Sequence, residues 1–180
     1  MTYEKLQKLL AAGKWREADE ETALVILKIA NPEEKSLTFL VEAGWLRVED
    51  INHFSCEDLR EMDRLWIEYS NSRFGFCVQR QIYQELGGTQ EFDRAVWEAF
   101  GDRVGWRKEG KWLSWRDLTF KIAAPHGHFP AFGELFNSQW ERFPGLGMCS
   151  DTNVDRYMDY GVGELRESVS LIGKLLECNI

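Results

Sequence analysis

Apolar residues recur every three or four positions along most of this chain, and that spacing is the period of one face of an α-helix. The first stripe runs from Tyr3 to Leu10 and is followed by Gly13, a residue suited to the position just past a helix end. A second stripe from Trp15 to Ile29 begins at once, so we expect two helices joined in a tight hairpin.

Four further helix starts are expected before residue 101. Residues 31–34 have the order of a cap, a first-turn proline and two acids. Ser55 has the properties of an N-cap, and the apolar stripe behind it is the clearest in the chain. Helical spacing returns after Phe74, and Thr89 is expected to cap a last helix that Gly101 ends.

Between Gly101 and Pro130 the helical period fails, and we expect an irregular loop with a turn at Glu109-Gly110. A final helix is expected from Val162 to Leu176, whereas the stretch 132–160 has no readable period. The sequence therefore predicts a compact single all-α domain of about seven to nine short helices with a long irregular aromatic loop.

Charge and hydropathy exclude several classes of protein. The 180 residues carry 22 basic and 30 acidic side chains, a net charge of -8, which disfavours a partner recognised through phosphates, so we expect no nucleic acid. No apolar run approaches the roughly 20 residues that a bilayer span requires, and the first residues do not resemble a secretory signal. We therefore expect a soluble protein without a membrane span.

Metal, nucleotide and nucleophile chemistry find little support. The four cysteines are far apart and form no Cys-x-x-Cys pair, so we expect thiols in a reducing compartment that pack as small hydrophobes. His126 and His128 are separated by one residue and could both bind a metal ion. A metal site needs further ligands, however, and we expect none here. No glycine-rich phosphate loop stands between a strand and a helix.

Aromatic and basic residues are concentrated together in the irregular loop. The chain has 8 Trp, 5 Tyr and 11 Phe, and six basic but three acidic residues lie between Asp102 and Lys121. Aromatic rings can cover a flat apolar ligand, and neighbouring guanidinium or ammonium groups can bind carboxylates at its edge. This pattern favours a large, planar, anionic ligand. Core filling and a protein interface are the alternatives.

Five ordered strings carry a family resemblance: Trp15-Arg16-Glu17-Ala18-Asp19-Glu20-Glu21-Thr22, Asp63-Arg64-Leu65-Trp66 with Tyr69-Ser70, Arg73-Phe74-Gly75-Phe76-Cys77-Val78-Gln79, Val104-Gly105-Trp106 and Ala124-Pro125-His126-Gly127-His128-Phe129-Pro130. Together they resemble the core domain of the "genomes uncoupled four" family of porphyrin-binding regulators of magnesium chelatase. The likeness covers about residues 3–130.

The resemblance implies an all-helical domain whose cupped apolar surface binds protoporphyrin or magnesium protoporphyrin. Two segments, 45–54 and 106–132, correspond to the loops of that cup. The ligand-binding residues that we expect from the resemblance and the aromatic pattern are Trp45, Phe54, Phe74, Trp106, Arg107, Trp115, Arg116, Phe120, His128, Phe129, Pro130 and Phe132. Phe129 takes the place of the leucine in the family's Gly-His-Leu-Pro motif.

The chain also departs from the family. We expect no N-terminal helical bundle of the kind found in cyanobacterial chelatase regulators, because the likeness to the core starts almost at Met1. Ala131–Phe136 stands where those regulators have the Asn and Arg residues that meet the propionates. We therefore expect a tetrapyrrole-binding core domain over residues 1–135. Residues 136–180 are expected to form a C-terminal extension with a terminal helix, packed on the same domain.

These expectations give a non-catalytic protein that binds a porphyrin, a magnesium porphyrin or a linear bilin as a carrier or regulator in chlorophyll metabolism. The large porphyrin-binding subunit of magnesium chelatase is the implied partner. We expect a monomer, in the cytoplasm of a cyanobacterium or in an algal plastid stroma. The alternatives are an interaction module that uses the same aromatic face without pigment, and a bilin lyase or isomerase that uses Cys149 or Cys56.

Overall fold

A computed structural model describes residues 2–30, 54–91, 93–131, 173–175, 177, 178 and 180 of the chain. Its elements are α1 (Glu4–Ala11), α2 (Trp15–Ala30), α5 (Cys56–Ser70), α6 (Phe76–Glu85), α7 (Arg94–Val104), β1 (Arg107–Lys108), β2 (Lys111–Trp112) and the 3-10 helix η1 (Trp115–Asp117). Helices dominate, and the predicted all-α class is confirmed. The helix start expected at residues 31–34 lies outside the described residues.

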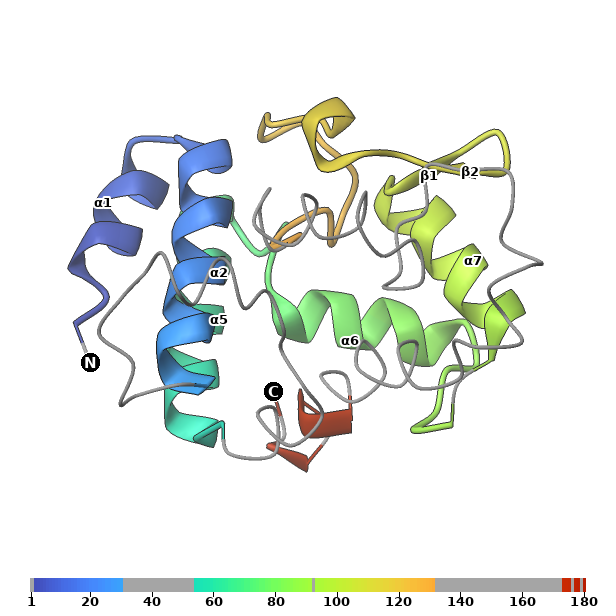
Figure 1. The fold of residues 1–180 in the computed structure, drawn as a ribbon, viewed down its shortest axis with the longest axis horizontal. Helices are drawn as coiled ribbons and strands as arrows, with labels where there is room; N and C mark the ends of the chain where they lie inside the picture. The colour runs from blue at the N-terminus through green and yellow to red at the C-terminus, as the bar shows by residue number, and fades with distance from the viewer. Residues whose placement is uncertain (1, 31–53, 92, 132–172, 176, 179) are drawn as a thin grey trace.

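Helices α1, α2 and α5 pack together on one side of the molecule, and α6 and α7 form the other side (Figure 1). The α1–α2 hairpin has the predicted boundaries, and Leu6 and Leu10 of α1 are buried. The segment from residue 105 to 131, yellow to orange in Figure 1, runs along one edge of both groups and connects α7 back to α2. The long loop thus spans the two halves of the fold.

Helix α5 matches the sequence prediction closely. The Ser55 hydroxyl accepts a hydrogen bond from the Asp58 amide at 3.0 Å, which satisfies one of the free N–H groups at the helix start. Leu59, Met62 and Trp66 lie on the apolar face and are fully buried. Their burial in the common core explains why this stripe was the clearest one in the sequence.

Both ends of α7 differ from the prediction. Asp93, rather than Thr89, caps the helix: its carboxylate accepts a hydrogen bond from the Val96 amide at 3.0 Å. Gly101 lies inside the helix, which ends at Gly105 in the left-handed conformation. A Cβ atom on Gly101 would lie 2.4 Å from the ring of Trp112, so this glycine serves the close approach of a side chain and does not end the helix.

The predicted turn at Glu109-Gly110 is confirmed, and the structure adds two short strands on either side of it. Strand β1 pairs with β2 in antiparallel register, with Arg107 opposite Trp112. Glu109 and Gly110 have φ angles of 53° and 79°, as a two-residue hairpin turn requires. The segment 101–130, expected to be irregular apart from this turn, therefore contains the end of α7 and a β-hairpin.

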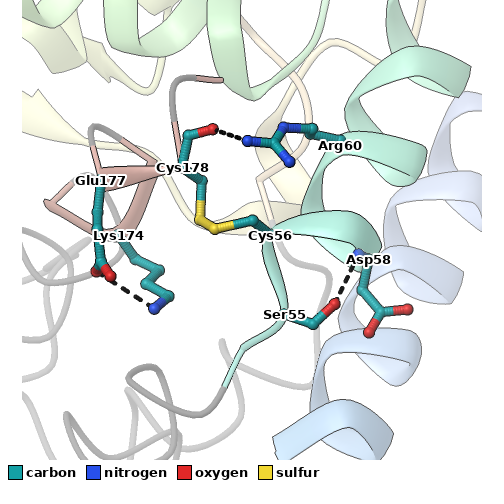
Figure 2. The surroundings of a disulfide bond; sticks show 7 residues. All are labelled: Ser55, Cys56, Asp58, Arg60, Lys174, Glu177 and Cys178. Carbon is teal, nitrogen blue, oxygen red and sulfur yellow. Dashed lines mark hydrogen bonds and ion pairs between the residues drawn. A yellow bond between two sulfur atoms is a disulfide. The ribbon is translucent and has the colours of Figure 1, made fainter.

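The prediction that the cysteines are free thiols is wrong for two of the four. Cys56 and Cys178 form a disulfide across 122 residues, with Cα atoms 5.2 Å apart (Figure 2). Sequence spacing could not show this pair, because the two cysteines are far apart in the chain and meet only where the end of the chain lies beside the start of α5. Cys77 is free, and burial raises the pKa of its thiol to about 11. Cys149 lies outside the described residues.

The part of the chain after residue 172 that the structure describes includes helical residues 173–175 and 177, near the end of the predicted final helix. Leu175 and Ile180 of this part are buried. Elsewhere, the region 132–160 lies outside the described residues. No helix in the described ranges is long and apolar enough to cross a membrane.

Substitution of the two candidate caps tests the corrected start of α7. Asp93→Ala should lower the free energy of unfolding by about 1 kcal/mol, because it removes the acceptor for a free amide at the helix start. Thr89→Ala should cost less, because the Thr89 hydroxyl bonds the exposed Glu91 amide outside the helix. Urea unfolding followed by circular dichroism measures both, and a larger loss for Thr89→Ala would contradict the assignment.

Candidate functional site

Residues of α6 and of the connection between α5 and α6 hold the long loop in place, although most of the loop lacks regular secondary structure. The Gln79 side-chain amide donates hydrogen bonds to the carbonyl oxygens of Gly127 and Pro130, each at 2.9 Å. Arg73 Nε donates to the carbonyl of Ala124 at 2.8 Å. The Gly75 amide donates to the carbonyl of Phe129 at 2.9 Å. These bonds fix residues 124–131 against the core.

The buried carboxylate of Asp19 on α2 binds two other points of the same loop. It accepts a hydrogen bond from Trp115 Nε1 at 2.7 Å through one oxygen, and from the Ala131 amide at 2.5 Å through the other. Asp19 is 0 % exposed, so both bonds form away from water, where an unmet carboxylate would be costly. One side chain thereby sets the position of the η1 indole and of the end of the loop.

His128 connects three parts of the loop and its base. Its Nδ1 lies 2.6 Å from the carbonyl oxygen of Val104, and its Nε2 accepts a hydrogen bond from the Thr119 amide at 3.2 Å. These partners require a neutral imidazole with its proton on Nδ1. Burial lowers the pKa of His128, although the bond to Val104 acts in the opposite direction. The carbonyl of His128 also accepts a bond from Trp106 Nε1 at 2.8 Å.

Three aromatic rings of the loop pack one against the next, and we call them the aromatic tier: Trp115, Phe120 and Phe129. Trp115 meets Phe120 edge to face at 4.9 Å between centroids, and Phe120 stacks on Phe129 at 5.3 Å. Phe129 in turn stacks on the core ring of Trp66 at 5.9 Å. The tier is thus continuous with the hydrophobic core.

Arg16 of α2 covers the outer side of the aromatic tier. Its guanidinium carbon lies 4.1 Å from the centroid of Phe120 and 4.9 Å from that of Trp115, within the range of cation–π attraction. Arg16 is exposed and Phe120 is half-buried, whereas Trp115 and Phe129 are buried. The accessible part of this arrangement therefore consists of one aromatic ring and a cation.

The structure separates the expected ligand-binding residues into different environments. The buried ones are Phe54, Phe74, Trp106, Trp115, His128, Phe129 and Pro130. Phe120 and Arg107 are half-buried, and Arg116 is exposed. Trp45 and Phe132 lie outside the described residues. A ligand-binding role for each of them stays a prediction, while the buried aromatic rings have a packing role in the core in any case.

Arg107 forms two ion pairs within the protein. It binds Glu98 at 2.8 Å and Asp102 at 2.9 Å, and its side chain is 16 % exposed. The exposed basic residues of the segment are Arg103, Lys108, Lys111, Arg116 and Lys121. Positive charge therefore remains at the surface of the loop after the Arg107 pairs are counted.

Three residues that organise the site were not named as site residues from the sequence: Arg16, Asp19 and Gln79. Arg16 and Asp19 lie in the first of the strings that carried the resemblance, and Gln79 ends the third. Membership in those strings was the available signal. It could not show that these three residues contact the loop, because the contacts join segments that are far apart in the chain.

The described residues contain no group of three or more His, Cys, Asp or Glu side chains that could hold a metal ion. His126 is exposed, while both ring nitrogens of His128 have partners within the protein. The arrangement offers an aromatic surface and positive charge rather than metal ligands.

Comparison with known proteins decides the family. A family model described as "GUN4-like" matches residues 1–144. The chain belongs to the GUN4-like family. This confirms the resemblance to the genomes uncoupled four proteins, while the domain boundary at residue 135 stays a prediction.

Similar proteins come from cyanobacteria, red algae and plants. A "Ycf53-like protein" of Synechocystis is 30% identical over 74% of this chain and 52% of its own length. An "Uncharacterized protein ycf53" of Porphyra purpurea is 32% identical over 75% of this chain and 52% of its own length. The "Tetrapyrrole-binding protein, chloroplastic" of Arabidopsis thaliana is 31% identical over 76% and 51%. The chain thus spans about half the length of these relatives.

Solved structures agree with this assignment. GUN4 from Chlamydomonas reinhardtii aligns with a TM-score of 0.58 and 28% identity, over 80% of this chain and 90% of that one. Ligand-free GUN4 from Arabidopsis thaliana aligns with a TM-score of 0.60 and 23% identity, over 95% of this chain and 94% of that one. This similarity supports the fold.

Replacement of Gln79 tests how the loop is held. Gln79→Met should lower the free energy of unfolding by roughly 2–6 kcal/mol, because two buried carbonyl groups lose their donor at about 1–3 kcal/mol each. Gln81→Met is the matched control on the same helix, since Gln81 is exposed and bonds only Glu85 among the described residues. Its effect should stay within about 0.5 kcal/mol. Similar losses for both variants in urea unfolding would refute the role of Gln79.

The neutral state of His128 predicts a pH dependence of stability. Since the folded pKa lies below the unfolded one, this contribution is complete above about pH 6.5 and is lost as the pH falls toward the folded pKa. His128→Asn keeps a donor for Val104 but cannot gain a charge. The stability difference between wild type and variant should therefore shrink from about pH 7.5 to about pH 5.5. Urea unfolding at both pH values measures it, and a constant difference would disprove the titration.

Proposed function

We propose that this protein is a non-catalytic tetrapyrrole-binding protein that acts as a carrier or regulator in tetrapyrrole metabolism. The observation that carries the proposal is the aromatic tier with Arg16 above it, in a chain of the GUN4-like family. The name of the Arabidopsis relative, a tetrapyrrole-binding protein, supports the ligand class.

The ring of Phe120 is the contact that we propose for the face of the macrocycle. It is half-buried, so one side is supported by Trp115 and Phe129 while the other side lies beneath the Arg16 guanidinium. A guanidinium over an aromatic ring can move aside or stack in turn on a planar ligand, because it is itself flat and weakly hydrated. The rigid support from Asp19 and Gln79 reduces the ordering cost of binding.

The exposed basic residues of the loop suit the carboxylates at the edge of a porphyrin or bilin. Lys121 directly follows Phe120, and Lys111 and Lys108 lie on the hairpin before η1. Charged hydrogen bonds to carboxylates orient a ligand that ring contacts alone would leave free to rotate. We propose that protoporphyrin, magnesium protoporphyrin and linear bilins all share this edge chemistry, and that one of them is the natural ligand.

A specific observation favours a second function, an interaction module that needs no pigment. Ile122, two residues after Phe120, is the exposed large hydrophobic residue of the described part of the chain, at 43%. A protein partner could cover Ile122 together with Phe120. The large porphyrin-binding subunit of magnesium chelatase is the partner that the family resemblance implies. For this chain, that partner and a monomeric state are part of the proposal, as is a location in cyanobacterial cytoplasm or plastid stroma.

Titration with protoporphyrin or a linear bilin, followed by quenching of tryptophan emission and by the pigment's absorption band, tests the proposed function. Arg16→Gln should weaken binding about 3- to 10-fold, the loss of roughly 1 kcal/mol of cation–π and charge attraction. Arg64→Gln removes the same charge from an exposed site on α5 and should leave affinity unchanged.

Two outcomes of the titration would overturn the pigment-binding proposal. One is the absence of any change in emission and absorption at micromolar protein with every pigment. The other is an equal loss of affinity in the Arg16 and Arg64 variants, which would indicate nonspecific attraction by net charge. If pigment does not bind but Ile122→Ser abolishes binding to the chelatase subunit, the interaction module is the correct function.

A further inference from the structure

The disulfide between Cys56 and Cys178 joins the first residue of α5 to the segment 173–180. Besides this bond, Arg60 of α5 donates a hydrogen bond from Nη2 to the carbonyl of Cys178 at 2.6 Å (Figure 2). Leu175 and Ile180 of the segment are 2% and 5% exposed. The described part of the segment is therefore held at α5 by a covalent bond and a hydrogen bond, and two of its apolar side chains are buried in the core.

The two sulfur atoms of this bond belong to residues in different environments. Cys56 is half-buried, whereas Cys178 is 1% exposed. An attacking thiolate therefore has access through Cys56. This asymmetry predicts which of the two cysteines forms a mixed disulfide with a reductant.

The surroundings of Cys56 suit a thiolate. It occupies the first position of the 15-residue helix α5, where the N-terminal end of the helix dipole stabilises a negative charge. The Arg60 guanidinium lies against the neighbouring Cys178 carbonyl. Two acids share the first turn of α5, Glu57 and Asp58. Glu57 is exposed to solvent, and Asp58 points away from the disulfide in Figure 2 and bonds the Tyr3 hydroxyl. A thiolate formed at Cys56 would therefore be a good leaving group in the second exchange, when the mixed disulfide at Cys56 is resolved.

We propose that the Cys56–Cys178 disulfide is a site of reversible reduction by a protein dithiol, and that its reduction releases the segment 173–180 from α5. A thiolate of the reductant attacks Sγ of Cys56 and forms a mixed disulfide, while Cys178 leaves as a thiolate and takes up a proton. The second thiolate of the reductant then attacks the reductant's own sulfur and closes the reductant's disulfide, while Cys56 leaves as a thiolate and takes up the second proton. Two electrons and two protons pass from the dithiol to the protein.

Release follows from what remains after reduction. Among the described residues, the attachments that remain include the Arg60 bond and the burial of Leu175 and Ile180. The described helical residues 173–175 and 177 are too few to form a stable helix alone. Lys174 gives a direct readout, because its side chain is 11% exposed and paired with Glu177 at 3.2 Å in the docked segment. The proposal is independent of tetrapyrrole binding.

The test compares oxidised and reduced wild-type protein, so it needs no substitution. A thioredoxin-type dithiol oxidoreductase should reduce the oxidised chain and make Cys56 and Cys178 reactive to N-ethylmaleimide, with Cys77 as the internal reference in peptide mass mapping. Trypsin cleavage after Lys174 should become at least roughly tenfold faster, since local release exposes the site. Reoxidation should restore protection, and circular dichroism should stay unchanged.

Variants sharpen the result. Reductant whose second cysteine is replaced by serine should be trapped on Cys56. Cys178→Ser should be cleaved rapidly under both conditions, whereas Cys77→Ser, the matched control, should respond to the dithiol as wild type does. Four results would overturn the proposal: resistance to the dithiol, trapping on Cys178, an unchanged cleavage rate after reduction, or loss of helical content, which would make the disulfide a static brace.

Discussion

The buried carboxylate of Asp19 is the interaction on which the rest of the site depends. It lies within α2, far from water, and its two oxygens bind the Trp115 indole and the Ala131 amide. A buried carboxylate is stable only when such donors meet it, so α2 and the loop require each other. The Asp19 side chain fixes the indole at one end of the aromatic tier and the backbone just past its other end.

Local signals predicted those parts of the fold that depend on local contacts. Ser55 and the stripe behind it gave α5 its start and its buried face, because a cap and a helical period act within a few residues. The ends of α7 could not be predicted in the same way. Thr89 and Asp93 are both good capping residues, and the role of Gly101 depends on Trp112 in another element. The disulfide was missed for the same reason, since its halves are 122 residues apart.

The candidate site was predictable in chemistry but not in geometry. An excess of tryptophan, phenylalanine and basic residues in one segment indicated an aromatic and cationic surface, and the ordered strings indicated the family. Neither could tell that Trp115 and Phe129 are buried while Phe120 is half-buried. Arg16 and Asp19 belong to α2, and their contacts with the loop arise only when the chain folds back by some hundred residues.

The glycine inside α7 has a consequence for the hairpin that follows it. Because the Trp112 ring rests directly on the backbone of Gly101, the base of the hairpin is fixed against α7, whereas Glu109 and Gly110 at the tip are exposed. The base of the hairpin is therefore held by packing, whereas its exposed turn tolerates replacement. A fluorophore or an affinity tag inserted at that turn would sit beside the basic surface and leave the packing of the helices as it is.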